Sequence, residues 1–306
     1  MGMKFAKRAV ACLLLTLVPG VSYADQVHML LETRSDFEAD DEKPLEEVYF
    51  MNAPGMADFK SNIFSSVGYL PLDIGKEYSI RAFAYAFGGY QMILESRNDK
   101  YGGEELYLMS YASLADVRSN TPSYMGYLPT DIDGGYSLAG LTVAGGTLQL
   151  FLQPNEDVDG YKRLYLVNYD SLDALKSGSV SSEYELGATI GIGYSSRGVT
   201  FDGTRYHMLL QLLADRESDE EPDLYLASFL GLDGLRNDVL DSGQFLPINI
   251  GRHYEVAGFS IDPSVQGPPS GVPEPGSWMM LVAGVGAVGG AMRAKRRGLA
   301  HCPQAC

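Results

Sequence analysis

The sequence has few residues that cross-link a chain. Cysteine occurs three times in 306 residues, at Cys12, Cys302 and Cys306, and none lies between residues 25 and 272. Disulfides therefore cannot hold this central region together, and its stability must come from burial of apolar side chains. Tryptophan occurs once whereas tyrosine occurs 20 times, and the Tyr- and Gly-rich composition favours strands and turns over long helices.

Basic residues are also scarce, with 23 Lys and Arg against 39 Asp and Glu. Three basic residues precede residue 25 and four follow residue 272, while Glu274 is the one acidic residue outside that region. Residues 25–272 therefore carry 16 basic and 38 acidic side chains, a net charge of −22. Because phosphate groups are bound by clustered Lys and Arg, this balance argues against nucleic acid and anionic lipid as partners.

Motifs of catalysis are missing as well. The sequence shows no Ser-His-Asp order with a nucleophile turn, no paired-His metal motif and no phosphate-binding Gly loop. Acidic residues are too numerous for a catalytic pair of a glycoside hydrolase to be recognised. We therefore assign no catalytic residue. We expect a non-enzymatic protein, because the chain contains four near-equal copies of one unit and no copy acquires distinctive residues, whereas an enzyme site usually breaks such symmetry. A secreted polysaccharide-active enzyme is the alternative.

The first 24 residues have the order of an export signal. Lys4, Lys7 and Arg8 precede an apolar run, residues 9–18, and small residues around Ala24 suit a signal peptidase. A second apolar run, residues 278–292, lies near the other end and precedes a basic cluster. As a helix it would span roughly 22 Å, short of a hydrocarbon core of about 30 Å. We therefore expect a short apolar helix that inserts into the membrane transiently.

The region around this run resembles the PEP-CTERM sorting signal. The resemblance covers residues 272–297 and rests on a Val-Pro-Glu-Pro motif, a tryptophan and the basic cluster: Val272, Pro273, Glu274, Pro275, Trp278, Arg293, Lys295, Arg296 and Arg297. It implies recognition and cleavage by an exosortase at the surface of a Gram-negative bacterium that secretes exopolysaccharide. Residues 263–271 are rich in Pro, Gly and Ser and predict a linker, and residues 298–306 extend beyond the family's usual end.

Residues 25–262 contain one unit four times. The tyrosines at 49, 107, 165 and 225 recur at spacings of 58, 58 and 60, as do the tyrosines at 78, 136, 194 and 254. Each unit predicts four short strands and one helical turn, the turn carrying apolar residues three apart, with Ser113 and Ser171 as helix caps. The third strand is expected to hold a repeated Leu and Ile, with Pro at its start in three copies: Pro71, Pro129 and Pro247.

Four short strands repeated four times predict an all-β fold, a four-bladed β-propeller. Counted outward from the axis of the ring, the segment His28 to Glu32 is expected to be the second strand of a blade. Residues 254–261 supply the first strand of that blade, so we expect the two ends to complete one blade. Ala82, Gly140, Gly198 and Gly258 share one register and suit an innermost strand, where blades crowd the axis. A β-sandwich of the same repeats is the alternative.

In every unit, acidic residues concentrate in the loop just before the strand that holds the tyrosine at 49, 107, 165 or 225. A ring would therefore place four acidic loops at one end. The segment with Asn155, Asp157 and Asp159 is the closest to a Ca²⁺ loop, since hard cations need several carboxylate oxygens. A solvated, charge-rich turn is the alternative reading. We expect an exported surface or matrix protein with a binding or structural role, its partners being the exosortase and exopolysaccharide or surface proteins.

Overall fold

The computed structural model describes residues 25–33, 48–72, 74, 78–96, 106–129, 135–156, 161–191, 193–212, 224–250 and 254–262. All of them lie in one compact unit, Ala24–Val265. The expected signal peptide, linker, sorting signal and tail, at 1–24, 263–271, 272–297 and 298–306, lie outside the described residues. Among the described residues no helix is long and apolar enough to cross a membrane.

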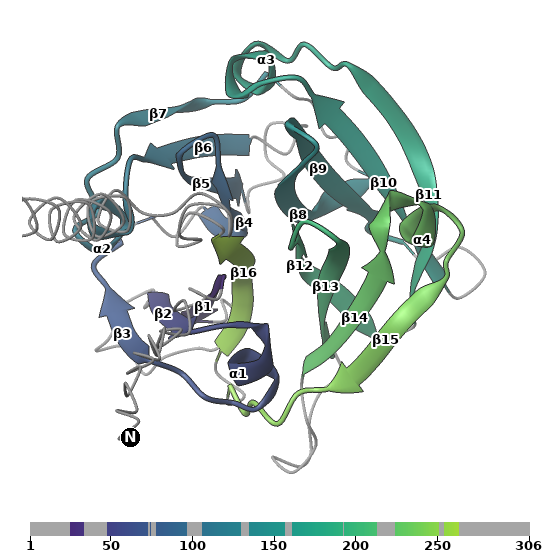
Figure 1. Cartoon of the computed structure of the whole chain (residues 1–306). Coiled ribbons are helices and arrows are strands. Elements are labelled where there is room, and N and C mark those ends of the chain that lie inside the picture. Colours follow the sequence, from purple (N-terminus) through teal and green to yellow (C-terminus); the bar gives the residue numbers. More distant parts are fainter. Residues whose placement is uncertain are drawn as a thin grey trace, which may run out of the picture. The chain divides into compact units, whose positions relative to one another are not determined.

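The described strands form four antiparallel sheets, which are the blades of a closed ring (Figure 1). From the axis outward, blade 1 contains β16 (Tyr254–Asp262), β1 (Gln26–Thr33), β2 (Val48–Ala53) and β3 (Ser66–Leu70). Blade 2 contains β4 (Tyr78–Ala86), β5 (Gly89–Ser96), β6 (Leu106–Tyr111) and β7 (Tyr124–Tyr127). Blade 3 contains β8 (Tyr136–Ala144), β9 (Thr147–Pro154), β10 (Tyr161–Tyr169) and β11 (Ser182–Gly191). Blade 4 contains β12 (Tyr194–Phe201), β13 (Arg205–Leu212), β14 (Leu224–Leu230) and β15 (Leu240–Phe245).

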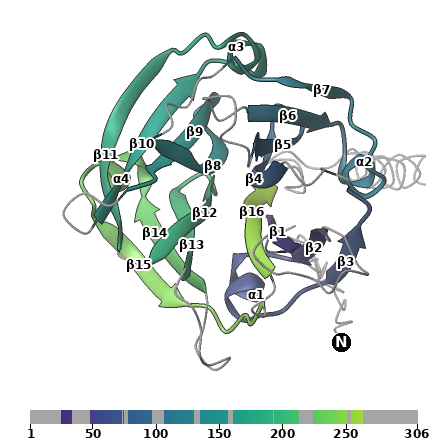
Figure 2. The ribbon, with the colours of Figure 1, turned by 180° about the vertical axis from the view of Figure 1, so that it is seen from behind.

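The prediction of a four-bladed propeller is confirmed, and so is the way it closes. Strand β16 pairs antiparallel with β1, with Asp262 opposite Gln26 and Tyr254 opposite Thr33. The last strand of the ring therefore completes the sheet that the first strand began. Seen from behind, β16 occupies the same innermost place in its blade as β4, β8 and β12 do in theirs (Figure 2). The β-sandwich alternative is set aside.

The inner strands approach one another closely at the register of small residues. A Cβ atom built on Gly140 would lie 2.4 Å from the Val199 backbone nitrogen, and one on Gly258 would lie 2.6 Å from the Phe83 Cβ. Real Cβ contacts are never this short, so larger residues at these two positions would push adjacent blades apart. This confirms the expectation that small residues mark the innermost strand.

One hydrogen bond is repeated at each of the four interfaces between blades. The last residue but one in the second strand of each blade is Glu or Gln, whose side-chain oxygen accepts a hydrogen bond from a backbone N–H of the inner strand of the next blade. The donor–acceptor pairs are Ile80–Glu32 at 2.9 Å, Leu138–Glu95 at 3.1 Å, Ser196–Gln153 at 2.9 Å and Val256–Gln211 at 2.9 Å. The four acceptors are buried. Because buried backbone N–H groups need partners, these side chains join the blades into a continuous ring.

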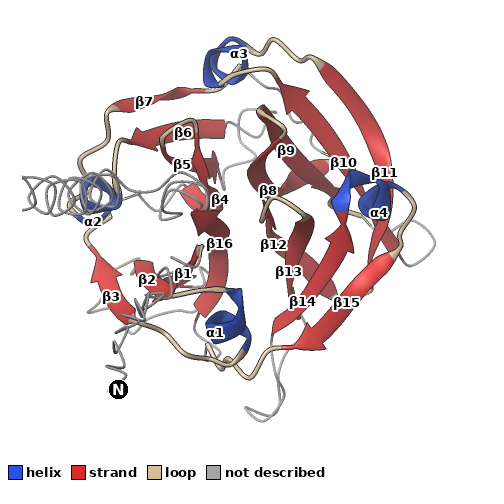
Figure 3. Cartoon of the chain, viewed as in Figure 1, coloured by secondary structure: helices blue, strands red, loops and turns tan. Residues whose placement is uncertain are grey.

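Each blade carries one short helix between its third and fourth strands (Figure 3). The helices are α1 (Met56–Lys60), α2 (Leu114–Arg118), α3 (Leu172–Ser177) and α4 (Gly231–Arg236), and each buries one apolar side chain: Phe59, Val117, Leu175 and Leu235. The predicted caps are confirmed, since Ser113 Oγ accepts from the Asp116 N–H at 3.2 Å and Ser171 Oγ from the Ala174 N–H at 3.0 Å. The helices anchor the outer strands to the blades.

The outer strands correct one sequence-based expectation. Proline was expected at the start of the third strand of the unit, but Pro71, Pro129 and Pro247 follow the ends of β3, β7 and β15. Proline lacks the N–H that a strand needs for pairing, so it ends these strands. Blade 3 has Gly187 at the same register, and its β11 continues to Gly191.

Candidate functional site

The inner strands bring a cluster of charged side chains to the axis. In blades 2, 3 and 4 the register of the inner strand shifts at the fourth residue, which leaves Arg81, Ala139 and Arg197 out of the ladder. Strand β16 shifts at the same place, leaving Ala257 out. A bulged residue escapes pairing and its side chain is aimed differently from its neighbours. Arg81 and Arg197 therefore come from opposite blades, 2 and 4, to the axis.

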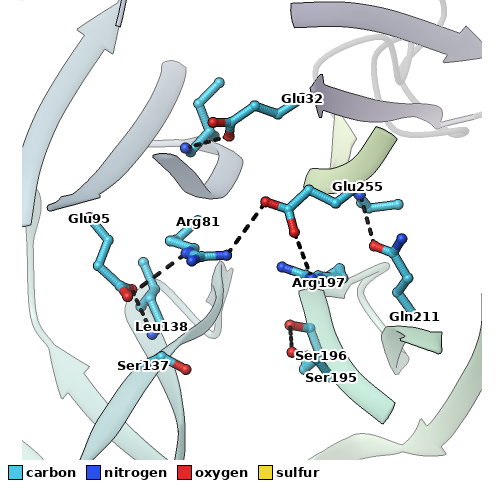
Figure 4. A network of polar contacts seen from close by, with 12 residues as sticks. Glu32, Arg81, Glu95, Ser137, Leu138, Ser195, Ser196, Arg197, Gln211 and Glu255 are labelled. Carbon is cyan, nitrogen blue, oxygen red and sulfur yellow. Dashed lines mark hydrogen bonds and ion pairs between the residues drawn. The ribbon is translucent and has the colours of Figure 1, made fainter. Parts of the chain in front are cut away.

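Glu255 joins these two arginines (Figure 4). Its Oε2 lies 2.8 Å from Nη2 of Arg197, and its Oε1 lies 4.0 Å from Nη1 of Arg81. Nε of Arg81 is also 3.8 Å from Oε1 of Glu95. We call Glu32, Arg81, Glu95, Arg197 and Glu255 the axial cluster. It combines two positive and three acidic groups in a largely buried place.

The axial cluster breaks the symmetry of the repeat. Three inner strands carry serine directly after their first tyrosine, Ser79, Ser137 and Ser195, whereas β16 carries Glu255. The bulge holds arginine in blades 2 and 4 and alanine in blades 1 and 3. The repeats therefore do acquire distinctive residues, which the comparison of tyrosine and leucine registers did not reveal. The signal in the sequence was a charged residue where the other copies have Ser or Ala.

Burial dominates the electrostatics of the cluster. The pKa of Glu95 is raised, because burial disfavours the carboxylate more than Arg81 and the Leu138 N–H stabilise it. Burial likewise lowers the pKa of Arg197, against the attraction of Glu255. The side chain of Arg197 is 10% exposed, and its Nε makes no hydrogen bond within the part of the chain that the structure describes. The cluster can therefore hold a carboxyl group that takes up a proton more readily than usual.

We call one end of the ring the loop end: there β1, β5, β9 and β13 end and β2, β6, β10 and β14 begin. Rows of aromatic rings run outward from the axis at this end. In blade 2, Tyr78 packs on Tyr107 at 6.3 Å between ring centroids, and Tyr107 packs on Tyr127 at 5.1 Å. In blade 1 the corresponding pairs are Tyr254–Tyr49 at 5.4 Å and Tyr49–Tyr69 at 6.1 Å, and in blade 4 Tyr225–Phe245 at 5.1 Å.

The inner tyrosines of these rows are half-buried, whereas the outermost rings are exposed. The outermost rings, Tyr69, Tyr127 and Phe245, are 49%, 60% and 54% exposed. Blade 3 departs from the pattern, because Glu185 stands at this register. Rings presented edge to face keep one surface available for apolar contact, including contact with sugar rings. The repeat tyrosines are thus strand residues, as their spacing indicates, and their outer partners form an exposed surface.

The histidines at equivalent strand positions are structural. His28 is fully buried and lies 3.4 Å from the Tyr90 hydroxyl, while Tyr90 donates a hydrogen bond to Asp262 across the interface of blades 1 and 2. His207 Nε2 lies 2.9 Å from Asp202 and its Nδ1 lies 2.8 Å from the Ser228 hydroxyl. Both rings are enclosed by side chains of the blades, which gives these histidines a structural role.

The residues singled out for sorting and for cation binding lie mostly outside the described part of the chain. This applies to all nine residues of the sorting signal and to Asp157 and Asp159. Asn155 follows β9, where its N–H donates to the Gly135 carbonyl at 2.8 Å and its carbonyl accepts from Lys162 at 3.2 Å. Within the described ranges no three His, Cys, Asp or Glu side chains gather as metal ligands.

Known proteins add little to this description. No protein-family model matches the sequence, and no curated protein resembles it. Among solved structures, the endosialidase of phage phi92 is 13% identical with a TM-score of 0.31, the match covering 62% of this chain and 32% of that one. An apocarotenoid oxygenase variant from Synechocystis is 10% identical with a TM-score of 0.28, covering 66% and 44%. The chain thus spans less than half the length of either, and no function is carried over from them.

Proposed function

We propose that this protein is an exported component of the bacterial surface or extracellular matrix, which binds exopolysaccharide or a surface protein with the loop end of its propeller. The observation that carries the proposal is the exposed outer ring of Tyr69, Tyr127 and Phe245, repeated in three blades at one end of the ring. Aromatic faces bind sugar rings with little loss of side-chain entropy. The sequence of the two chain ends supports export.

Binding is tested by replacing the outer rings. The Tyr69→Ala, Tyr127→Ala, Phe245→Ala triple variant should lose at least tenfold in affinity for exopolysaccharide, measured by co-sedimentation. The control is the Ile63→Ala, Val180→Ala double variant. These two side chains are 54% and 44% exposed and lie beside the helices at the other end of the blades. Equal binding by both variants would show that the loop end is not the binding surface.

Export and sorting are tested on the protein made in an exosortase-producing bacterium. Mass spectrometry of the mature ends should find cleavage after Ala24 and near Pro273–Pro275. Replacing Glu274 by alanine should leave the tail on the chain and keep it in the membrane fraction. An uncleaved wild-type tail would contradict sorting through this signal without affecting the binding proposal.

Calcium binding belongs to the proposal as a property of the loop around Asn155, Asp157 and Asp159, because several oxygen ligands at alternate positions suit Ca²⁺. Titration calorimetry should give a heat of binding that is lost when Asp157 and Asp159 are both changed to asparagine. Absence of heat and of a thermal shift with the wild-type protein would exclude the site.

A polysaccharide-active enzyme is the second candidate, favoured by the two carboxyl groups, Glu95 and Glu255, that flank Arg81. A carboxyl group with a raised pKa can donate a proton to a leaving group while a second acts as base or nucleophile. Reducing-sugar release from exopolysaccharide, abolished by Glu95→Gln and by Glu255→Gln in folded variants, would establish it. Undiminished release in both variants, or none from the wild type, would reject this role for the pair.

A further inference from the structure

Blade 4 contains an open cavity that the axial cluster does not reach. It measures about 380 Å³ and lies between β11 of blade 3 and the sheet of blade 4. Most of its wall is apolar, with aromatic rings from Tyr194, Tyr225, Phe229 and Phe245. Tyr225 and Phe229 lie four residues apart on β14, so the cavity extends for about 13 Å along the strand at ~3.3 Å per residue.

The cavity coincides with a small side chain at one position of the repeat. Two residues after the repeated tyrosine at 49, 107, 165 and 225, the side chain is Met51 in blade 1, Met109 in blade 2 and Val167 in blade 3. In blade 4 it is Ala227, which lines the cavity. Buried space beside a sheet is normally filled to the density of an organic crystal. Blade 4 has therefore lost the side chain that occupies this register in the other three.

A single carboxylate stands at the mouth. Asp238 lines the cavity, is exposed, and accepts a hydrogen bond from the Thr189 hydroxyl at 3.2 Å. It follows helix α4 with a left-handed φ of 52°, a conformation that asparagine adopts after α1 and α2, at Asn62 and Asn120. Only blade 4 therefore has a charge at this position. A carboxylate at an apolar mouth repels anions without hindering neutral molecules.

We propose that this cavity is a binding site for small, flat, neutral aromatic molecules, and that Asp238 makes it selective against anionic ones. Aromatic walls favour a flat aromatic ligand, because offset and edge-to-face contacts add to the burial of its surface. The volume and the apolar lining are those of a site for a small molecule. The site adjoins the aromatic row of blade 4 at the loop end, with which it shares Tyr225 and Phe245, and it does not involve the rows of blades 1 and 2.

The test uses two probes that differ in one sulfonate group, N-phenyl-1-naphthylamine and 1-anilinonaphthalene-8-sulfonate, with the full chain in 150 mM salt. The neutral probe should show saturable fluorescence with one site, and the anionic probe should bind at least tenfold more weakly. Ala227→Met, which restores the residue of blades 1 and 2, should weaken the neutral probe at least tenfold while the protein keeps its fold and melting temperature. Leu240→Asp, at the exposed wall, is the second variant if Ala227→Met fails to fold.

Selectivity is tested with Asp238→Asn, which has its precedent in the other repeats. It should strengthen the anionic probe at least threefold and leave the neutral probe unchanged. Asp233→Asn on α4 is the control, because it changes the net charge equally at a side chain that does not line the cavity. No saturable binding by the wild type, or unaltered binding by the filled variants, overturns the site. An equal response of both asparagine variants overturns the role of Asp238.

Discussion

Asp202 shows how a single carboxylate stabilises a turn between two inner strands of blade 4. It accepts hydrogen bonds from the backbone N–H groups of Thr204 and Arg205 at 2.8 and 2.6 Å and pairs with His207. Burial by itself raises the pKa of Asp202, but the hydrogen bonds from His207 and the two N–H groups outweigh it and lower the pKa from 3.8 to about 2. The charged form is therefore the form that the fold prefers.

This shift predicts how stability depends on pH. Because the folded-state pKa is depressed, the contribution is present above pH 3.8 and is lost as the pH falls toward about 2. Asp202→Asn should cost about 2 kcal/mol of unfolding free energy at pH 7, with the difference from wild type shrinking between pH 4 and pH 2. Urea denaturation at several pH values measures it. Asp170→Asn, at an exposed residue, should change little, and a pH-independent difference for Asp202→Asn would contradict the assignment.

The axial cluster predicts strong coupling between Arg197 and Glu255. Removing Glu255 alone, as Glu255→Ser, leaves a buried arginine without its 2.8 Å partner and should cost about 3 kcal/mol. Arg197→Ala with Glu255→Ser should cost less than the sum of the single changes, by about 2 kcal/mol. Both new residues occupy the same registers in other blades, so neither should strain the backbone. Additive effects in urea denaturation would show that the pair contributes nothing as a pair.

Among the elements, the inner strands are the least tolerant of added volume. Gly140→Ala places a Cβ 2.4 Å from the Val199 backbone nitrogen and should destabilise the fold by about 2 kcal/mol. Gly68→Ala on the outer strand β3 is the matched control, because no atom lies within 4 Å of its Cβ, and it should change stability by less than about 0.5 kcal/mol. Equal midpoints of denaturation for the two variants would mean that the inner strands move apart and accommodate the added methyl group at little cost.

The positions of most elements could be predicted from the repeat registers. The tyrosine at position 107 lies in β6 and the serine at 113 caps α2, as their spacing indicated. Proline was misplaced because its preference for strand edges fits either end of a strand, and the hydrogen-bond partners that distinguish the two ends are not visible in a sequence. The extension of β11 to Gly191 could not be predicted for the same reason, since the change from Pro to Gly187 allows a longer strand only where the partner β10 continues beside it.

For the whole molecule, closure by β16 should decide whether a ring forms at all. A chain ending at residue 253 leaves β1 as an open edge, and such edges pair with other chains. We expect this chain to aggregate or to lose cooperative unfolding, whereas one ending at residue 265 should remain monomeric. Size-exclusion chromatography and thermal unfolding followed by circular dichroism measure both. A monomeric short chain with an unchanged melting temperature would show that closure is dispensable.

The candidate site was less predictable than the ring that carries it. Arg81 and Arg197 are far apart in the sequence, and both contact Glu255 of another blade, so their partners follow only from the closed structure. The acidic loops could be recognised in the sequence because their charged residues are adjacent in the chain. Arg81 and Arg197 were not predicted because each is the one charged residue of its strand, and Glu255 because the other charge of β16, Asp262, lies seven residues away.

The pairing of Gln26 with Asp262 has a further consequence. Both limits of the propeller lie side by side at the same corner of blade 1, so the ring has no intrinsic start. A short peptide joining residue 262 to residue 26, with a new opening at the Gly145–Gly146 turn between β8 and β9, would give a circular permutant with identical strand pairing. For the same reason, a segment attached at residue 26 or at residue 262 is joined to the propeller at blade 1 and at no other blade.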